Sequence, residues 1–197
     1  FTTVNFDNLS ISKNIFLSKK NWPYKEYNEA SLEYHNFSWL LVAKKIGGGE
    51  AISLSKKNIF EWKKNNYRFS SFAWNGEIVA KRLINLIYNF DFFAISADYK
   101  EKNIIFNIIA KNYFVLNLKN KFEKNIVDQS IQIQKALLLY KLFFNINIEK
   151  ILSNIKRHLV KNVNSNGVHI SMNSNYQSEY INDLYEIKNM LLFFNKK

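Results

Sequence analysis

Residues that interrupt regular structure are scarce in this sequence. Its 197 residues include one proline and five glycines. Because proline and glycine mark turns and end helices, their scarcity favours long helices over many short strands. Consecutive helices joined by short connectors pack as antiparallel hairpins. We therefore predict an all-α fold for this chain.

Apolar residues recur at helical spacing in seven segments, which predicts seven helices. The segments cover residues 31–46, 53–64, 77–89, 99–118, 125–145, 148–163 and 176–194. Ser53 or Ser55 is expected to cap the second helix, and Asn147 the sixth. Asp98 with Glu101 forms a capping box for the fourth. The glycines at 47–49 are expected to end the first helix.

The first 30 residues carry many aromatic side chains without a clear period. We predict an irregular arm over residues 1–30, with short strand pieces at 11–17, that packs on the helical body. The remaining residues, 31–197, suit one helical domain. The chain begins with Phe1 and stops directly after the apolar run 190–194, which indicates a fragment of a longer protein.

Positive charge dominates the composition, with a formal net charge of +12. Clustered Lys and Arg attract polyanions, but Lys, Asn, Ile, Phe and Tyr are all frequent together here, as AT-rich codons would produce. We therefore expect no nucleic-acid partner, whereas an acidic polysaccharide is compatible with this charge. No uninterrupted run of about 20 apolar residues occurs, so no membrane partner is expected.

Cysteine is absent, and the three histidines lie in separate regions of the sequence. This pattern excludes a disulfide framework and thiolate chemistry, and it predicts neither a metal site nor a cofactor. A chain without cysteine is equally compatible with a periplasmic and a cytoplasmic location.

The stretch 162–175 is a polar connector between two predicted helices. It gathers several asparagines, two serines and His169 around Gly167, and these polar side chains can hydrogen-bond a ligand. Because histidine suits proton transfer at neutral pH, His169 is a candidate general base or substrate ligand. The alternative is a histidine that only fixes the loop by hydrogen bonding.

A second candidate region is the aromatic loop 65–76, which contains Arg68 and Trp74. Aromatic ring faces stack on sugars, while guanidinium groups bind hydroxyls and carboxylates. This favours a sugar-binding cleft, although Trp74 could instead plug the end of a helical hairpin. Arg82 lies beside the apolar stripe of the following helix, where it is either buried against a carbonyl or carboxylate or faces a cleft.

Several motifs follow one another in the order seen in the helical domain of heparinase II/III-like proteins. They comprise residues 33–40, Trp62, residues 72–74 leading into 82–87, residues 166–173 and residues 181–184. The chain resembles this family over residues 30–197. The resemblance implies an α/α toroid, incomplete here, that is followed in the full-length protein by a C-terminal β-sandwich.

The resemblance also implies a polysaccharide lyase that cleaves acidic, uronic-acid-containing glycans by β-elimination. This reaction needs a group that neutralises the C5 carboxylate, a base for the C5 proton and an acid for the leaving oxygen. Family enzymes use Asn or Arg for the first role and Tyr or His for the others. His169 and Asn173 are therefore the predicted catalytic residues. The predicted substrate-binding residues are Trp74, Arg82, Arg68, Ser171 and Tyr176.

Four positions depart from the usual family pattern, which reads Asp-Gly-Gly-His, a variable residue and Ser-Arg-Asn-Pro. They are Asn166, Val168, Met172 and Ser174. Met172 replaces an arginine, the best bidentate partner for a carboxylate. The alternative function is therefore a non-catalytic helical domain that binds a glycan or a protein partner. The fragment alone is expected to be inactive.

Overall fold

The computed structural model describes residues 29–66, 68–69, 72–122 and 131–195. Helices α2 to α10 provide the regular structure of these residues, apart from one isolated bridge between Val163 and His169. The all-α fold class is therefore confirmed for the described part of the chain. The predicted arm and its strand pieces at 11–17 lie outside the described residues, except for the last two positions of the arm.

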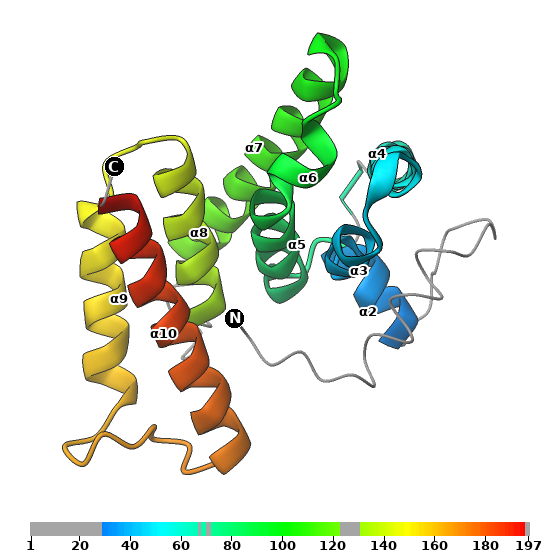
Figure 1. Ribbon diagram of the computed structural model, residues 1–197. Coiled ribbons are helices and arrows are strands. Elements are labelled where there is room, and N and C mark those ends of the chain that lie inside the picture. Colours follow the sequence, from blue (N-terminus) through cyan, green and yellow to red (C-terminus); the bar gives the residue numbers. More distant parts are fainter. Residues whose placement is uncertain (1–28, 67, 70–71, 123–130, 196–197) are drawn as a thin grey trace. The chain divides into compact units, whose positions relative to one another are not determined.

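The chain divides into two compact units, unit 1 with residues Phe1–Lys119 and unit 2 with residues Asn120–Lys197. Figure 1 shows the helices of both. The boundary falls inside helix α7, which spans Tyr99–Phe122. A single helical domain over 31–197 stays a prediction.

Helix α5 (Gly76–Tyr88) packs against three other helices of unit 1. These are α2 (Glu29–Asn36), α3 (Trp39–Ile46) and α6 (Phe90–Ala94). Helix α4 (Gly48–Asn66) packs in turn against α3 and α6. Burial of a large apolar side chain contributes about 1.5–3 kcal/mol. Fully buried members of this core include Trp39, Trp62, Leu86, Phe93 and Ile105.

The predicted continuous helix over 31–46 is wrong, because the chain breaks between α2 and α3. Phe37 has a left-handed backbone with φ of 63°, and Oδ1 of Asn36 accepts a hydrogen bond from Ser38 N at 2.8 Å. Phe37 and Trp39 are both buried, with ring centroids 5.4 Å apart. Burial of two aromatic rings thus outweighs the local preference for one helix.

Two predicted helix ends are confirmed, and at a third the N-cap position of α9 is Ile148, one residue after the predicted Asn147. Gly47 ends α3 with φ of 70°. Asp98 and Glu101 cap α7 reciprocally: Glu101 N donates to Oδ1 of Asp98 at 2.8 Å, and Asp98 N donates to Oε2 of Glu101 at 3.0 Å. Oδ1 of Asn147 accepts a hydrogen bond from Glu149 N at 2.9 Å, at the start of α9. Each cap satisfies a backbone group that has no partner within its helix.

Helix α4 begins earlier than predicted. Neither Ser53 nor Ser55 caps it, because the helix starts at Gly48, directly after the glycine that ends α3. Ser55 is buried within α4, and its Oγ donates to the carbonyl oxygen of Ala51 at 2.7 Å. Gly47 and Gly48 have φ of 70° and 80°, values that glycine adopts without steric cost. The chain therefore turns from one helix into the next without a connector.

Unit 2 contains helices α8 (Ile131–Phe143), α9 (Glu149–Asn162) and α10 (Ser174–Asn195). Helix α8 packs against both α9 and α10, and the three helices alternate in direction (Figure 1). The unit therefore consists of antiparallel helical hairpins. Their apolar stripes form its core, which includes Ile133, Leu137, Leu138, Ile151, Ile155, Ile187 and Met190.

A buried lysine joins α8 to α10. Lys135 Nζ lies 2.5 Å from Oδ1 of Asp183 and 2.8 Å from Oε2 of Glu186. Burial raises the pKa of Asp183 above its ordinary value of 3.8, while the charge of Lys135 acts in the opposite direction. The carboxyl group of Asp183 therefore binds its proton more tightly in the folded protein than in the unfolded chain.

This difference in proton affinity predicts a pH-dependent effect of Asp183→Asn. Stability that comes from the protonated carboxyl is lost when Asp183 ionises. The free energy of unfolding of the wild type should therefore fall, relative to that of the variant, as the pH rises from below 3.8 through the raised pKa. Urea denaturation of both proteins at a series of pH values measures this difference. If the free energy of unfolding of the wild type, relative to that of Asp183→Asn, stays constant or rises with pH, the raised pKa of Asp183 is contradicted.

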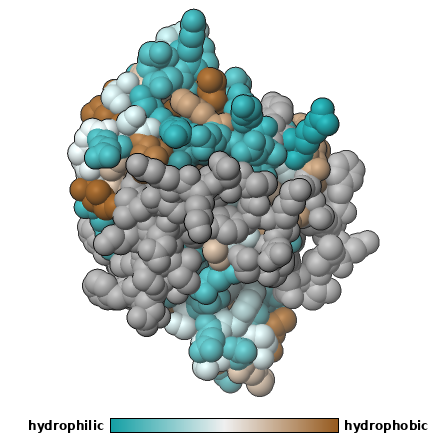
Figure 2. Space-filling view, turned by 90° about the vertical axis from the view of Figure 1, so that its right-hand side faces the viewer, coloured by the Kyte–Doolittle hydropathy of each residue, from teal (hydrophilic) through white to brown (hydrophobic). Residues whose placement is uncertain are grey.

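The coloured part of the face in Figure 2 is largely hydrophilic, and hydrophobic residues occupy small separate areas of it. Single exposed apolar side chains of this kind are normal on a protein surface. Among the helices that the structure describes, none combines the length and the apolar character needed to cross a membrane.

Candidate functional site

The connector between α9 and α10, here called the polar loop, covers residues 163–173. Oδ1 of Asn164 accepts hydrogen bonds from the backbone N of Asn166 and of Val168, both at 3.0 Å. Gly167, with φ of 78°, supplies the left-handed residue of the turn. The side chain of Asn164 therefore holds the backbone of the turn in place. This structural role explains part of the asparagine content of the polar loop.

His169 is held inside the polar loop, with 3% of its surface exposed. Its backbone N donates to Oε1 of Gln177 at 2.6 Å. Its Nδ1 accepts a hydrogen bond from the backbone N of Ser171 at 3.1 Å and lies 2.9 Å from Ser171 Oγ. Because a backbone N–H can only donate, Nδ1 carries a lone pair, and the neutral ring holds its proton on Nε2.

Two tyrosines of α10 flank the His169 ring, with centroids 4.6 Å (Tyr176) and 4.9 Å (Tyr180) from it. Tyr180 is buried, and its Oη lies 2.9 Å from Nδ1 of His158. Burial, followed by the charge of Tyr176, raises the pKa of Tyr180 to about 12, so this phenol keeps its proton. Tyr176 is only half-buried. Tyr176 is therefore the more accessible of the two tyrosines beside His169.

Asn173 lies exposed at the start of α10. Its Oδ1 accepts a hydrogen bond from the backbone N of Tyr176 at 3.1 Å, and its carbonyl oxygen accepts one from Gln177 N at 2.8 Å. The Oδ1 atom therefore caps the helix, and the exposed Nδ2 group is a donor for a ligand. The positive end of the α10 dipole at the same place favours an anion.

Four of the predicted site residues thus meet in unit 2, namely His169, Ser171, Asn173 and Tyr176. They combine an amide donor, a helix N-terminus and a phenol, groups that can bind a carboxylate and move a proton. Gln177 belongs to the same hydrogen-bond network but was not predicted. No local pattern links a glutamine to a histidine eight positions earlier.

Arg82 is fully buried in unit 1. Its Nε donates to Oδ1 of Asn112 at 2.9 Å, and its Nη1 donates to the carbonyl oxygens of His35 and Ala73 at 2.8 and 2.9 Å. Burial lowers the pKa of Arg82 to about 9, so the guanidinium is still charged at neutral pH. A glycan could contact this group only if the surrounding packing opened.

Aromatic rings and cations alternate around Arg82. Its Cζ lies 4.2 Å from the ring centroid of Trp62 and 5.0 Å from that of Trp74. Lys111 Nζ lies 4.9 Å from the ring centroid of Trp74 and 4.8 Å from that of Phe69. We call this series the cation–aromatic column. Each such contact contributes about 0.5–2 kcal/mol, more where the cation is desolvated.

The other two predicted substrate-binding residues of unit 1 differ in exposure. Trp74 is buried, and its Nε1 donates to the carbonyl oxygens of Asn66 and Arg68 at 3.0 and 3.1 Å. These bonds hold the backbone at Asn66 and Arg68 against Trp74, which is a member of the column. The side chain of Arg68 is exposed. Of the three predicted residues in unit 1, Arg68 is therefore the one whose side chain a ligand can meet directly.

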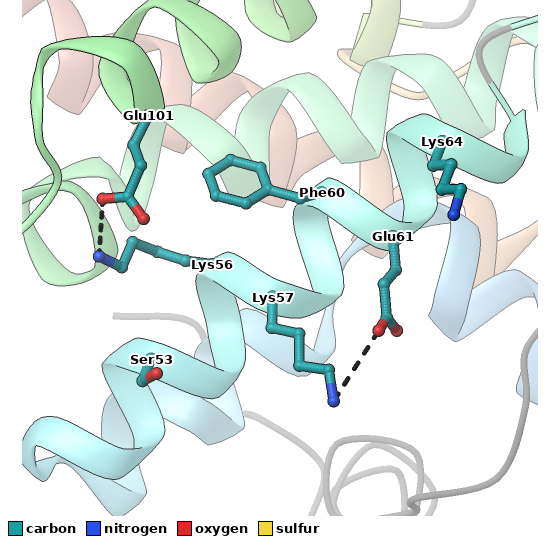
Figure 3. A pocket seen from close by; sticks show the side chains of 7 residues that line it. All are labelled: Ser53, Lys56, Lys57, Phe60, Glu61, Lys64 and Glu101. Carbon is teal, nitrogen blue, oxygen red and sulfur yellow. Dashed lines mark hydrogen bonds and ion pairs between the residues drawn. The ribbon is translucent and has the colours of Figure 1, made fainter.

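A separate pocket of about 420 Å³ lies along one face of α4 (Figure 3). Lys56 Nζ lies 2.8 Å from Oε2 of Glu101, and Lys57 Nζ lies 3.9 Å from Oε1 of Glu61. Because these lysines face carboxylates, much of the positive charge in the pocket is already balanced. We assign this pocket no ligand.

Comparisons with models of known families, with curated proteins and with solved structures found no match. Within the described ranges, no group of three or more His, Cys, Asp or Glu side chains could hold a metal ion. The candidate chemistry lies in the polar loop and in the cation–aromatic column. These two groups belong to different units.

Proposed function

We propose that this chain is the helical part of an α/α toroid in a heparinase II/III-like polysaccharide lyase. In this proposal the polar loop and the start of α10 contribute to a site that cleaves uronic-acid-containing glycans by β-elimination. The observation that carries the proposal is the pairing of Tyr176 with a fixed His169, with their ring centroids 4.6 Å apart. The antiparallel hairpin packing of unit 2 supports the toroid.

The proposed reaction assigns one step to each group. The Nδ2 amide of Asn173 and the N-terminus of α10 neutralise the C5 carboxylate, which makes the C5 proton more acidic. The phenol of Tyr176 takes part in proton transfer, as the base at C5 or as the acid at the leaving oxygen. The C5 proton passes to the base, the C5–H electron pair forms the C4=C5 double bond, the C4–O bond breaks, and the glycosidic oxygen receives a proton from the acid.

His169 has a supporting part in this mechanism. Its Nδ1 already accepts a hydrogen bond from Ser171 N at 3.1 Å, so protonation at Nδ1 would break that bond. The ring instead packs against Tyr176 and links it to the polar loop. The geometry therefore favours Tyr176 over His169 for the proton transfer, while a direct catalytic role of His169 stays a prediction.

A second candidate function is glycan binding without catalysis. Met172 is 80% exposed at the position where the family pattern has arginine, so the polar loop lacks a strong bidentate partner for a carboxylate. Asn173 and the α10 N-terminus could still bind such a group weakly. A helical module of this kind would hold an acidic glycan without changing it.

The two functions are separated by incubating the full-length protein with polymers of galacturonate, glucuronate and guluronate. Lyase activity predicts rising ultraviolet absorbance from the unsaturated product, and no rise with a neutral glucan. Binding of a uronate polymer with unchanged absorbance would favour the binding module. Neither binding nor product with any of these polymers would refute both candidates.

A further inference from the structure

The cation–aromatic column ends at the surface of unit 1. Phe69 is 66% exposed, and its ring centroid lies 5.0 Å from that of Trp74. Trp74 is itself fixed by the two hydrogen bonds from its Nε1 to backbone carbonyls. The exposed ring therefore rests on an ordered base, as a stacking surface requires.

Lys111 is held at the same end of the column. Its Nζ lies within 5 Å of two rings, at 4.8 Å from the centroid of Phe69 and 4.9 Å from that of Trp74. A lysine placed in this way loses less side-chain freedom on binding an anion than an unrestrained surface lysine does.

Lys111 lies in a positively charged environment. Burial lowers the pKa of Lys111, and the charge of Lys63 lowers it further. The exposed side chain of Arg68 belongs to the residue directly before Phe69. A carboxylate beside Lys111 would reduce the repulsion between Lys111 and Lys63 and accept a charge-assisted hydrogen bond from Lys111.

We propose that Phe69, Lys111 and Arg68 form a binding subsite for a uronic acid residue of a glycan. The pyranose ring packs on the face of Phe69, and its carboxylate meets the Lys111 ammonium and the Arg68 guanidinium. The choice of an acidic glycan as ligand rests on the proposed function. The subsite adds Phe69 and Lys111 to the residues expected to contact substrate, and it assigns them selectivity for acidic over neutral sugars.

Calorimetric titration of the full-length protein tests this subsite. The probe is an oligogalacturonate tetramer, with neutral maltotetraose as its uncharged counterpart. The Tyr176→Phe background prevents turnover of the probe during the titration. We expect Lys111→Gln and Phe69→Ala each to raise Kd about tenfold, which corresponds to about 1.4 kcal/mol. Lys57→Gln, which removes the same charge from α4, should leave Kd within about twofold.

The outcomes separate the subsite from the proposed lyase activity. Weaker binding in Lys111→Gln and Phe69→Ala supports the subsite even if the protein forms no unsaturated product. The subsite is overturned if both variants bind the tetramer as Lys57→Gln does, if the protein does not bind it, or if maltotetraose binds equally well. Circular dichroism of each variant establishes that the helices are retained.

Discussion

Replacing Tyr176 by phenylalanine is expected to lower kcat for β-elimination by about 10²–10⁴-fold, the usual contribution of a positioned acid or base. The substitution removes the phenolic hydroxyl and keeps the ring, whose centroid lies 4.6 Å from that of His169. The packing of the polar loop and the binding of substrate should therefore change little, so KM should stay within a few-fold. Initial rates of unsaturated product formation measure both constants.

Tyr185→Phe is the matched control for this experiment. Tyr185 lies on the same helix and is 59% exposed, so its loss of a phenol should leave kcat unchanged. Denaturation of both variants checks that a loss of kcat is not caused by a loss of stability. A Tyr176→Phe protein as active as Tyr185→Phe would remove Tyr176 from the proposed reaction.

Substitution of Arg82 by alanine is expected to lower the free energy of unfolding by about 3–5 kcal/mol, because three buried acceptor oxygens lose their donor at about 1–3 kcal/mol each, while the cost of burying the guanidinium is relieved. The variant loses the hydrogen bonds to Asn112, His35 and Ala73, whose acceptor oxygens stay buried without the guanidinium. It also leaves a cavity between Trp62 and Trp74. Urea denaturation followed by tryptophan fluorescence measures the loss.

Two further variants test whether the loss of stability is specific to the guanidinium of Arg82. Arg82→Lys keeps the positive charge but cannot reproduce the planar fork, so its stability should lie between those of the wild type and Arg82→Ala. Arg68→Ala changes an exposed arginine near the same rings and should alter stability by less than about 0.5 kcal/mol. If Arg82→Ala were as stable as Arg68→Ala, the buried contacts of Arg82 would not stabilise unit 1.

The parts of the fold that the sequence predicted are those with local causes. The capping box of Asp98 and Glu101 needs only residues that are near in sequence, as does the glycine turn at 47–49. The break at Phe37 has a distant cause, because that ring packs 5.3 Å from Trp62, a residue of another helix. The apolar pattern of residues 31–46 alone indicates one continuous helix and does not show the contact with Trp62.

The candidate site also has parts with local causes and parts with distant causes. The polar loop was predictable because its turn chemistry and its histidine lie within one short stretch. The burial of His169 depends on Gln177 and on the tyrosines of α10, which only the folded helix brings close. Lys111 could not be connected with Phe69 and Trp74 from the sequence, because a helical period does not show which neighbouring loop a lysine covers.

The most direct measurement of the central claim is a proton NMR time course of an oligogalacturonate incubated with the full-length protein. Elimination at the polar loop predicts that the H5 signal of the cleaved sugar disappears while a vinylic H4 signal appears at the same rate. It also predicts that both changes become about 10²–10⁴-fold slower in Tyr176→Phe. New reducing ends without a vinylic signal, or equal rates in the two proteins, would contradict the proposed function.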